Sequence, residues 1–400
     1  MFSRSFPWSL DPPAMSKRIL LITERYAPDL GGVATSSKRV VEFFSELGAE
    51  VHVFSWTKTL PPGQLSSTQI SPGSGKQLVT HRMGLFGNMD FSLQYSFNIF
   101  DWLFDKHEFD LVWGHYLFPA GFVAVTVAEL YRKPSVVSAR GNDIDRLMFP
   151  PGDFARLQWT LERATHVTSV SRDLVKKIDV ILGRKSNATV LGNVVDVDIF
   201  RPLPTSDVSN NPDNPFFKTN SPILGFCGEL RQKKGLPILL QTFDRLHESL
   251  GAKLLIIGAV RTRENNELSE FLADHPHLED QLLVTGHLAD PIEVSHFINR
   301  CDVMLFPSLW DGIPNSMLES MACGKLVVAS DAGGIPEILT DGETGFLVSK
   351  HALATFAEEV HRVISLPENE KHKIQQNARH YCVDLWENKD YLSKLSKLIA

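Results

Sequence analysis

Short apolar runs alternate with helix-length amphipathic segments along most of the chain. Such runs predict buried strands, and their regular alternation with helices is typical of parallel α/β sheets. The strands expected in the first half are RILLIT (18–23), EVHVFSW (50–56), KQLVTH (76–81), DLVWGHY (110–116), PSVVSAR (134–140), HVTSVS (166–171) and ATVLGN (188–193). The same alternation occurs in the second half, where the expected strands are ILGFCGE (223–229), KLLIIGA (253–259), QLLVTGH (281–287), VMLFPS (303–308) and LVVASD (326–331). The pattern predicts two doubly wound, Rossmann-like α/β domains.

The boundary between the halves is predicted at a segment rich in Pro, Asn and Ser. Residues 202–222 can form neither a strand nor a helix for long, so we interpret them as the linker. The N-terminal domain is expected over 15–201 and the C-terminal domain over 223–383, because 400 residues exceed what one core usually supports. Residues 1–14 lack the apolar core of a signal peptide and are predicted to be a disordered leader, with an aromatic interfacial anchor as the alternative.

The net charge, the cysteines and the length of the apolar runs limit the classes of function that this protein can have. The net charge is −7, which argues against a nucleic-acid binder because phosphate-backbone binding needs a basic face. The four cysteines are widely spaced without a CxxC pair, so neither a zinc site nor a disulfide framework is expected, and a cytoplasmic location fits. No apolar run approaches the roughly 20 residues of a membrane span. An anionic ligand would therefore be held by a few well-placed cations.

The loop after the first strand is a candidate ligand loop, because ligands of doubly wound sheets bind beyond the carboxyl ends of the strands. Gly31 and Gly32 let the backbone approach a ligand closely, and the helix that follows offers its N-terminus to an anion. A tight turn without a ligand is the alternative. The GxGxxG dinucleotide fingerprint is absent from the strand–helix junctions.

A second candidate loop is GFCGELRQKKG (225–235), which follows the first strand of the second half. Gly228 permits close backbone approach, and Arg231 and Lys234 can reach a diphosphate. A solvated basic loop is the alternative interpretation.

The segment WDGIPNSMLESMACG (310–324) places two acids around a helix start that follows a strand. Ser316 and Glu319 fit a capping box, which could explain Glu319 without any ligand. Asp311 and Glu319 would lie about 12 Å apart along a helix, whereas retaining glycosidases hold their carboxyls roughly 5–5.5 Å apart. Two carboxylates that hold different hydroxyls of a long polar ligand fit this separation better. A second glycine turn before a helix start occurs at SDAGGIPEI (330–338).

Taken together, PSLWDGIPNSMLESMACG and the following VVASDAGGIPEILTDGETGFLV resemble the donor-site signature of retaining GT-B glycosyltransferases of the family 4 type, also called glycosyl transferases group 1. That signature has an acid, seven residues, a glutamate and then a Gly-Gly-x-Pro-Glu turn. The other matching segments occur in the family's order: the Gly31-Gly32 loop, SARGNDID (138–145), RATHVTSVSRDL (163–174), GNVVDVDIFRP (192–202) and GFCGELRQKKG.

This resemblance implies a GT-B fold, in which two Rossmann-like domains face each other across a cleft. A C-terminal helix of about residues 384–400 would complete the N-terminal domain, with Trp386 as its anchor or as an ordinary core residue. The Gly31-Gly32 loop and Asp143 would lie on the acceptor and phosphate side. The catalytic residues implied are His115, Arg231 and Lys234, although His115 taken alone also fits a structural histidine.

The donor site implied by the resemblance is in the C-terminal domain. Glu319 would bind the ribose hydroxyls, and Arg231 and Lys234 would neutralise the diphosphate. The remaining donor contacts implied are Gly228, Asp311 and the backbone of Gly312, Ile313, Pro314 and Asn315.

Two positions depart from the family pattern. Glu229 stands where the family often has arginine, so Arg231 is expected to take over the cationic role. Asp311 replaces the commoner glutamate, which shortens its reach. The Asp-x-Asp sequences at 143–145 and 196–198 fall in acceptor-side and hinge segments of the family, so no metal site is expected.

The function implied is transfer of a sugar, with retention, from a UDP- or GDP-linked donor to a glycan or lipid-linked acceptor hydroxyl, with no cofactor beyond the donor. A nucleotide-sugar epimerase and a catalytically silent nucleotide-binding subunit remain alternatives, the latter because of Glu229. Segment 89–104 is aromatic and fits either an acceptor groove or core packing, so peripheral contact with the inner face of a membrane stays open.

Overall fold

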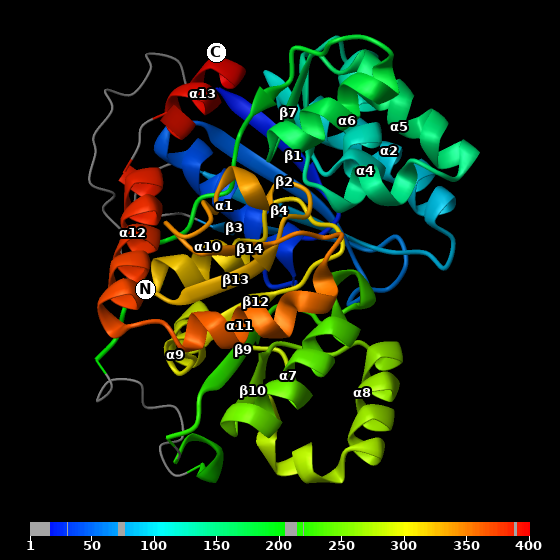
Figure 1. Ribbon diagram of the computed structural model, residues 1–400. Helices are drawn as coiled ribbons and strands as arrows, with labels where there is room; N and C mark the ends of the chain where they lie inside the picture. Colours follow the sequence, from blue (N-terminus) through cyan, green and yellow to red (C-terminus); the bar gives the residue numbers. More distant parts are fainter. Residues whose placement is uncertain (1–16, 30, 71–76, 205–213, 219, 388–389) are drawn as a thin grey trace. The chain divides into compact units, whose positions relative to one another are not determined.

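The computed structural model describes residues 17–29, 31–70, 77–204, 214–218, 220–387 and 390–400. The predicted leader, and residues 205–213 and 219 of the predicted linker, lie outside these residues. The chain divides into two compact units: unit 1 comprises residues 1–192 and 389–400, and unit 2 comprises residues 193–388. Each unit contains a β-sheet, parallel or largely parallel, together with helices (Figure 1). This architecture confirms the predicted α/β class with two Rossmann-like domains.

Within the described part of unit 1, eight strands form one sheet in the order β3-β4-β2-β1-β5-β6-β7-β8. The strands are β1 Arg18–Thr23, β2 Glu50–Thr57, β3 Leu65–Ile70, β4 Leu78–Gly84, β5 Leu111–His115, β6 Ser135–Ala139, β7 His166–Ser169 and β8 Thr189–Val190. The helices are α1 Gly32–Glu46, α2 Met89–Lys106, α3 Phe122–Leu130, α4 Asn142–Leu147, α5 Pro151–Arg163, α6 Arg172–Leu182 and α13 Asp390–Ile399. A five-residue π-helical turn, Leu117–Gly121, links β5 to α3.

The centre of this sheet explains why its strands read as continuous apolar runs. Strand β1 pairs in parallel with β2 and β5, and Ile19–Ile22 are fully buried. Parallel strands that are covered on both faces bury both sets of alternating side chains, so no polar alternation appears. The β1–β5 register sets Thr23 opposite His115 at the carboxyl ends of the two strands.

Strand β3 is not among the predicted strands. It is the edge strand, pairs antiparallel with β4, and exposes most of its LSSTQI side chains. An edge strand with one partner needs no apolar run, so hydrophobic patterning carries little signal for it.

Within the described part of unit 2, six parallel strands form a sheet in the order β11-β10-β9-β12-β13-β14. The strands are β9 Ile223–Cys227, β10 Lys253–Ile257, β11 Leu282–Val284, β12 Val303–Phe306, β13 Leu326–Ser330 and β14 Phe346–Val348. The helices are α7 Leu236–Leu250, α8 Thr262–Asp274, α9 Pro291–Asn299, α10 Asn315–Ala322, α11 Phe356–Ile364 and α12 Glu368–Glu387. The prediction lacked β14, whose three residues are too short for a periodic signal.

Residues 193–201 belong to unit 2, although the predicted N-terminal domain extended to residue 201. Val195, Val197 and Phe200 are buried in the core of unit 2. Arg379 on α12 fixes this segment by donating to the carbonyls of Val197 (3.0 Å) and Phe200 (2.7 Å). In the described part of the predicted linker, Pro215–Phe217 form a 3-10 turn.

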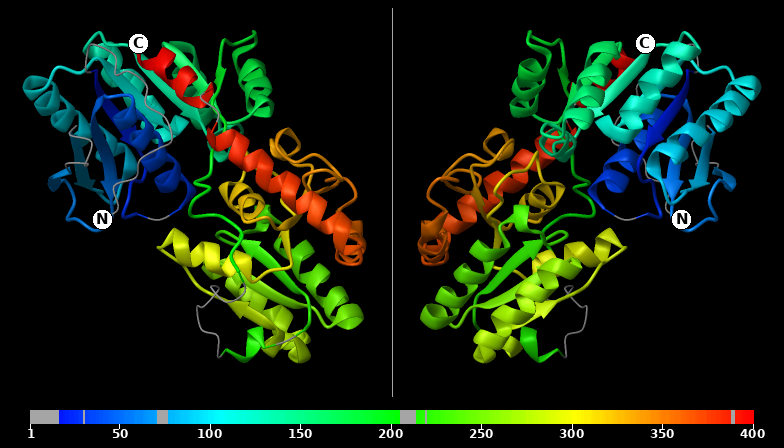
Figure 2. Two further views of the ribbon diagram at one scale, coloured as in Figure 1. Left: turned by 90° about the vertical axis from the view of Figure 1, so that its left-hand side faces the viewer. Right: turned by 90° about the vertical axis from the view of Figure 1, so that its right-hand side faces the viewer.

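The C-terminal residues divide between the units. Helix α12 continues to Glu387 in unit 2 and packs against α10 (Figure 2), so the predicted start of the C-terminal segment near residue 384 falls inside it. Trp386 packs on the core of unit 2. Helix α13 groups with unit 1, where the Tyr391 ring lies 4.9 Å from the Phe43 ring. None of the helices in the described ranges is both long and apolar enough to cross a membrane.

Candidate active site

The carboxyl ends of β9 and β10 approach each other closely in unit 2. Cys227 lies opposite Ile257 in the register, and the Gly228 N–H donates to the Ile257 carbonyl (2.9 Å). Gly228 and Gly258 both have positive φ, and a Cβ on Gly258 would lie 2.3 Å from the Gly228 oxygen. The two glycines therefore let adjacent strand ends meet without side chains between them.

The loop after β9 is fastened to the loop after β12. Gly235 has φ +81°, and a Cβ there would lie 1.9 Å from the Pro307 carbonyl oxygen. The Leu309 N–H donates to the Lys233 carbonyl (2.8 Å). These contacts hold residues 228–235 beside residues 307–311, so the two predicted donor segments form one site.

Lys234 and Asp311 form an ion pair at this junction. Their side chains are 19% and 14% exposed, and Asp311 Oδ1 also accepts from the Gly312 N–H (3.0 Å). Burial alone would raise the pKa of Asp311, but Lys234 beside it and Lys233 nearby hold that pKa below its ordinary value. Asp311 is therefore an anion at neutral pH, and it holds the ammonium of Lys234 at the sheet edge.

The second glycine turn, which contains Gly333 and Gly334, packs against the loop that contains Asp311. Gly333 has φ +56°, and a Cβ on it would lie 1.8 Å from the Asp311 carbonyl oxygen. The Gly334 N–H donates to the Gly312 carbonyl (3.2 Å). The Gly-Gly-x-Pro-Glu turn thus packs backbone against backbone, which explains its glycines without a direct ligand contact.

Helix α10 begins at the site, with Pro314 at the N-cap and Asn315 as its first residue. Ser316 lies inside the helix, and Pro314 has no side-chain acceptor, so the capping box that could account for Glu319 by itself is not formed. Asn315 Oδ1 is buried and has no hydrogen-bond partner among the described residues. A buried acceptor of this kind at a helix start is suited to a ligand donor.

Glu319 lies one turn further along α10, half-buried beneath the end of β9. After burial, its charge is the largest cause that raises the pKa of the Cys227 thiol well above its ordinary value. The loop ahead of the helix is fixed by Asn193, whose side-chain N–H donates to the Ile313 carbonyl (2.7 Å).

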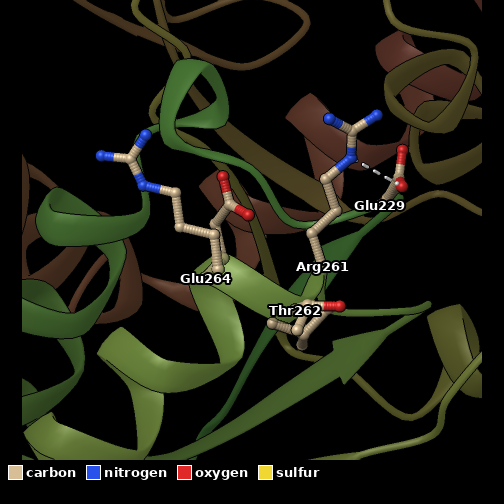
Figure 3. Close-up of a pocket in the computed structure, with 6 residues that line it drawn as sticks. Glu229, Arg261, Thr262 and Glu264 are labelled. Atoms are coloured by element: carbon tan, nitrogen blue, oxygen red, sulfur yellow. Dashed lines mark hydrogen bonds and ion pairs between the residues drawn. The ribbon is translucent and has the colours of Figure 1, made fainter.

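Glu229, the residue that departs from the family pattern, lies between two arginines. Its Oε2 accepts from Arg231 Nε (2.7 Å) and its Oε1 accepts from Arg261 Nε (2.9 Å). Burial alone would raise the pKa of the Glu229 carboxyl, but the two arginines bound to it hold that pKa below its ordinary value. A pocket of about 570 Å³ opens beside this group, between Glu229, Arg261 and the first turn of α8 (Figure 3).

In unit 1, His115 ends β5 and is fully buried. Its Nε2 lies 2.8 Å from Ser36 Oγ on α1, and Ser36 Oγ donates to the Val33 carbonyl (3.1 Å). Because the Ser36 proton is used, Nε2–H is the donor of the first contact and Nδ1 carries a lone pair, which has no partner in the described ranges. Burial, with the nearby Arg140, holds the pKa of His115 well below its ordinary value, so the ring is neutral.

The other predicted residues of unit 1 differ in their surroundings. Gly31 is the N-cap of α1 with φ +115°, and a Cβ on Gly32 would meet nothing within 4 Å, so the backbone there faces open space. Asp143 is fully buried, and its carboxylate accepts from the backbone N–H groups of Arg140 (3.1 Å), Gly141 (2.8 Å) and Leu117 (3.1 Å). These bonds give Asp143 a structural task in the turn after β6; its acceptor-side role stays a prediction.

Asp196 of the second Asp-x-Asp sequence also accepts hydrogen bonds from backbone N–H groups, as Asp143 does. Asp196 Oδ1 accepts from the N–H groups of Asp198 (3.1 Å) and Ile199 (3.2 Å). Among the residues that the structure describes, no group of three or more His, Cys, Asp or Glu side chains is arranged to hold a metal ion.

Two residues beside these sites were not predicted. Arg261 follows Gly258 at the end of β10, on the same sheet edge as Gly228, and this shared edge was the available signal. Ser36 is the fifth residue of α1, and nothing in the sequence links it to His115 across 79 positions.

Two doubly wound units, one with a glycine-rich sheet edge beside a helix N-terminus, define the class of GT-B glycosyltransferases. The family Glycosyl transferases group 1 matches residues 207–381, and Glycosyltransferase Family 4 matches residues 30–199. The chain therefore belongs to the group 1, family 4 type of glycosyltransferases, as the sequence resemblance implied.

Individual relatives agree with this family. The capsular polysaccharide biosynthesis glycosyltransferase CapM of Staphylococcus aureus is 27% identical over 54% of this chain, and the chain spans 56% of that relative. The N-acetyl-alpha-D-glucosaminyl L-malate synthase of Bacillus anthracis is 22% identical over 80% of this chain and 81% of its own length. The crystal structure of Anabaena Alr3699/HepE in complex with UDP-glucose has a TM-score of 0.77 and 18% identity, covering 95% of this chain and 99% of that one.

Proposed function

We propose that this glycosyltransferase moves a sugar from a nucleoside-diphosphate sugar to an acceptor hydroxyl, with retention at the anomeric carbon. The observation that carries the proposal is the Lys234–Asp311 pair beside the N-terminus of α10, on a loop whose glycines allow close approach of backbone to ligand. A cation beside a helix N-terminus favours a diphosphate.

The donor is held in unit 2. Glu319 accepts from the ribose hydroxyls as a charge-assisted acceptor, and the backbone from Gly312 to Asn315 faces the sugar and diphosphate. The donor is UDP- or GDP-linked, and the fold shared with a protein solved with UDP-glucose supports a nucleotide-sugar donor. Arg231, Lys234 and the helix N-terminus supply the positive charge, so donor binding needs no divalent metal.

The proposed reaction is a same-face transfer in which the leaving diphosphate serves as the base. The bond between the anomeric carbon and the diphosphate oxygen breaks, the acceptor oxygen forms its bond on the same face, and the departing phosphate oxygen takes the acceptor proton. No protein side chain acts as a covalent nucleophile in this course. Lys234 stabilises the charge that grows on the leaving diphosphate, a preorganised contact of the kind worth about a hundredfold or more in rate.

His115 takes part through hydrogen bonding. Its ring is neutral and its Nε2–H is used by Ser36, which leaves the Nδ1 lone pair as an acceptor for a substrate hydroxyl. His115 therefore orients a substrate without transferring a proton.

The acceptor is a glycan or a lipid-linked glycan, as in polysaccharide biosynthesis, the process named for the CapM relative. A cytoplasmic site of action, with peripheral contact to the inner face of a membrane, is part of the proposal, and the four buried free cysteines suit a reducing compartment.

The test is nucleotide release from a panel of UDP- and GDP-sugars, with and without an extract that contains acceptor. A transferase releases nucleotide fastest when both donor and extract are present. An isomerised donor without any extract would indicate an epimerase, and no turnover under either condition would indicate a silent binding subunit.

A further inference from the structure

The cations assigned to the diphosphate are already paired with acids in this protein. Lys234 pairs with Asp311, and Arg231 pairs with Glu229. The formal charges of these four side chains sum to zero. These acids offset the two cations, so a further cation at the same sheet edge would strengthen the hold on a diphosphate, which carries at least two negative charges.

Arg261 is such a cation: it shares the Glu229 carboxylate with Arg231, and counted with these four side chains it brings their formal charge to +1. It follows β10, and the strand end beside it is joined to the phosphate loop by the Leu230–Val260 bridge and by the close approach of Gly258 to Gly228. The carboxylate of Glu229 accepts from both Arg261 and Arg231, so both guanidinium groups are held at this loop.

The geometry of Arg261 leaves its terminal nitrogens available. Its side chain is 50% exposed, and among the described residues its hydrogen bond runs from Nε to Glu229 (2.9 Å). Figure 3 shows this Nε contact as a dashed line between Arg261 and Glu229 at the pocket. The fork of a guanidinium matches two oxygens of a phosphate, and a tether at Nε fixes the direction of the fork.

The pocket beside Arg261 has a size suited to a small molecule. Its volume of about 570 Å³ falls within the range of ligand sites, roughly 300–1,000 Å³. Arg263 also borders it, but its side chain is 82% exposed and pairs weakly with Glu267 on the same helix (3.9 Å). Arg261 is thus the arginine that the fold holds in place there.

We propose that Arg261 is a further donor-binding residue and that its guanidinium contacts a phosphate group of the nucleoside diphosphate. This inference rests on the proposed function, since it adds a contact to the same donor. A phosphate could also come from free inorganic phosphate, and the arms of the experiment separate the two sources.

The experiment compares the affinities of UDP, GDP, UMP, GMP, uridine, guanosine and inorganic phosphate by calorimetry, in the full-length protein and three variants. Arg261→Gln removes the charge, and Arg261→Lys keeps the charge without the fork. Arg245→Gln is the matched control, because Arg245 is 44% exposed and pairs with Glu358 at 2.8 Å on the outer helices of the same unit.

Arg261→Gln is expected to weaken the preferred nucleoside diphosphate about tenfold or more and to raise KM with little change in kcat. Arg261→Lys should lose less, the nucleosides should bind equally in all variants, and Arg245→Gln should match the parent.

Three results would overturn the inference alone: equal diphosphate affinity in Arg261→Gln and parent, an equal loss for nucleosides, or a loss confined to inorganic phosphate. A parent protein that binds neither UDP nor GDP would overturn the proposed function together with it.

Discussion

Removal of the Lys234 ammonium should separate catalysis from stability. Lys234→Ala leaves Asp311 as a carboxylate that is 14% exposed and retains the Gly312 N–H and the field of Lys233. Breaking a fully buried pair costs about 3–5 kcal/mol, and an exposed pair contributes about 0–1 kcal/mol. With both partners slightly exposed and Asp311 still partly satisfied, we expect a loss of about 2 kcal/mol, or roughly 4–8 °C in melting temperature for a unit of this size.

The rate of transfer should fall much further, by about a hundredfold or more, because the contact strengthens as charge grows on the diphosphate. The assay is the initial rate at saturating donor, well below the melting temperature of each variant. Lys233→Ala is the control, since it removes a neighbouring cation and keeps the main-chain carbonyl that accepts from the Leu309 N–H. If Lys234→Ala transfers sugar at near the parent rate, Lys234 does not serve the leaving group.

Three further outcomes are expected. Glu319→Gln should weaken nucleotide-sugar binding with the melting temperature nearly unchanged, because no capping box depends on the carboxylate; unchanged calorimetric affinity would contradict its ribose role. Gly333→Ala should be more destabilising and more damaging to activity than Gly342→Ala, since both have positive φ but a Cβ meets the Asp311 carbonyl only at residue 333; equal melting temperatures would refute this. His81 has a pKa lowered to about 4 by burial and by His52 and His107, so the unfolded chain takes up its proton first and stability should decline as pH falls from about 6.5 to about 4. His81→Gln should flatten that decline in a pH series of melting temperatures.

Sequence patterning located most strands because parallel strands buried on both faces read as apolar runs. It failed where burial is one-sided or the strand is short, as at β3 and β14. The domain boundary was misplaced because Val195, Val197 and Phe200 look like the end of one domain in sequence, while Arg379 holds their segment in the other.

The positions of the candidate residues were predictable where their loops follow a strand end, whereas their roles stay predictions. Arg231, Lys234 and Asp311 lie at one sheet edge, as their loops indicated. The pairing of Arg231 with Glu229 and of Lys234 with Asp311 could not be read from the sequence spacing. The capping box at Ser316 and Glu319 matched a local pattern, but the N-cap is Pro314, two residues before Ser316, so the box does not form. The contacts of Arg261 with Glu229 and of Ser36 with His115 depend on strand order, which local sequence does not encode.

In the function proposed for this glycosyltransferase, protein side chains and a helix N-terminus hold the nucleoside diphosphate without a metal. It is tested most directly by calorimetric titration of UDP and of GDP into the full-length protein in EDTA, repeated after addition of excess Mg²⁺. We expect one of the two nucleotides to bind in EDTA, with an affinity that Mg²⁺ changes little. Binding of neither nucleotide in EDTA, with affinity appearing only after Mg²⁺ is added, would contradict it.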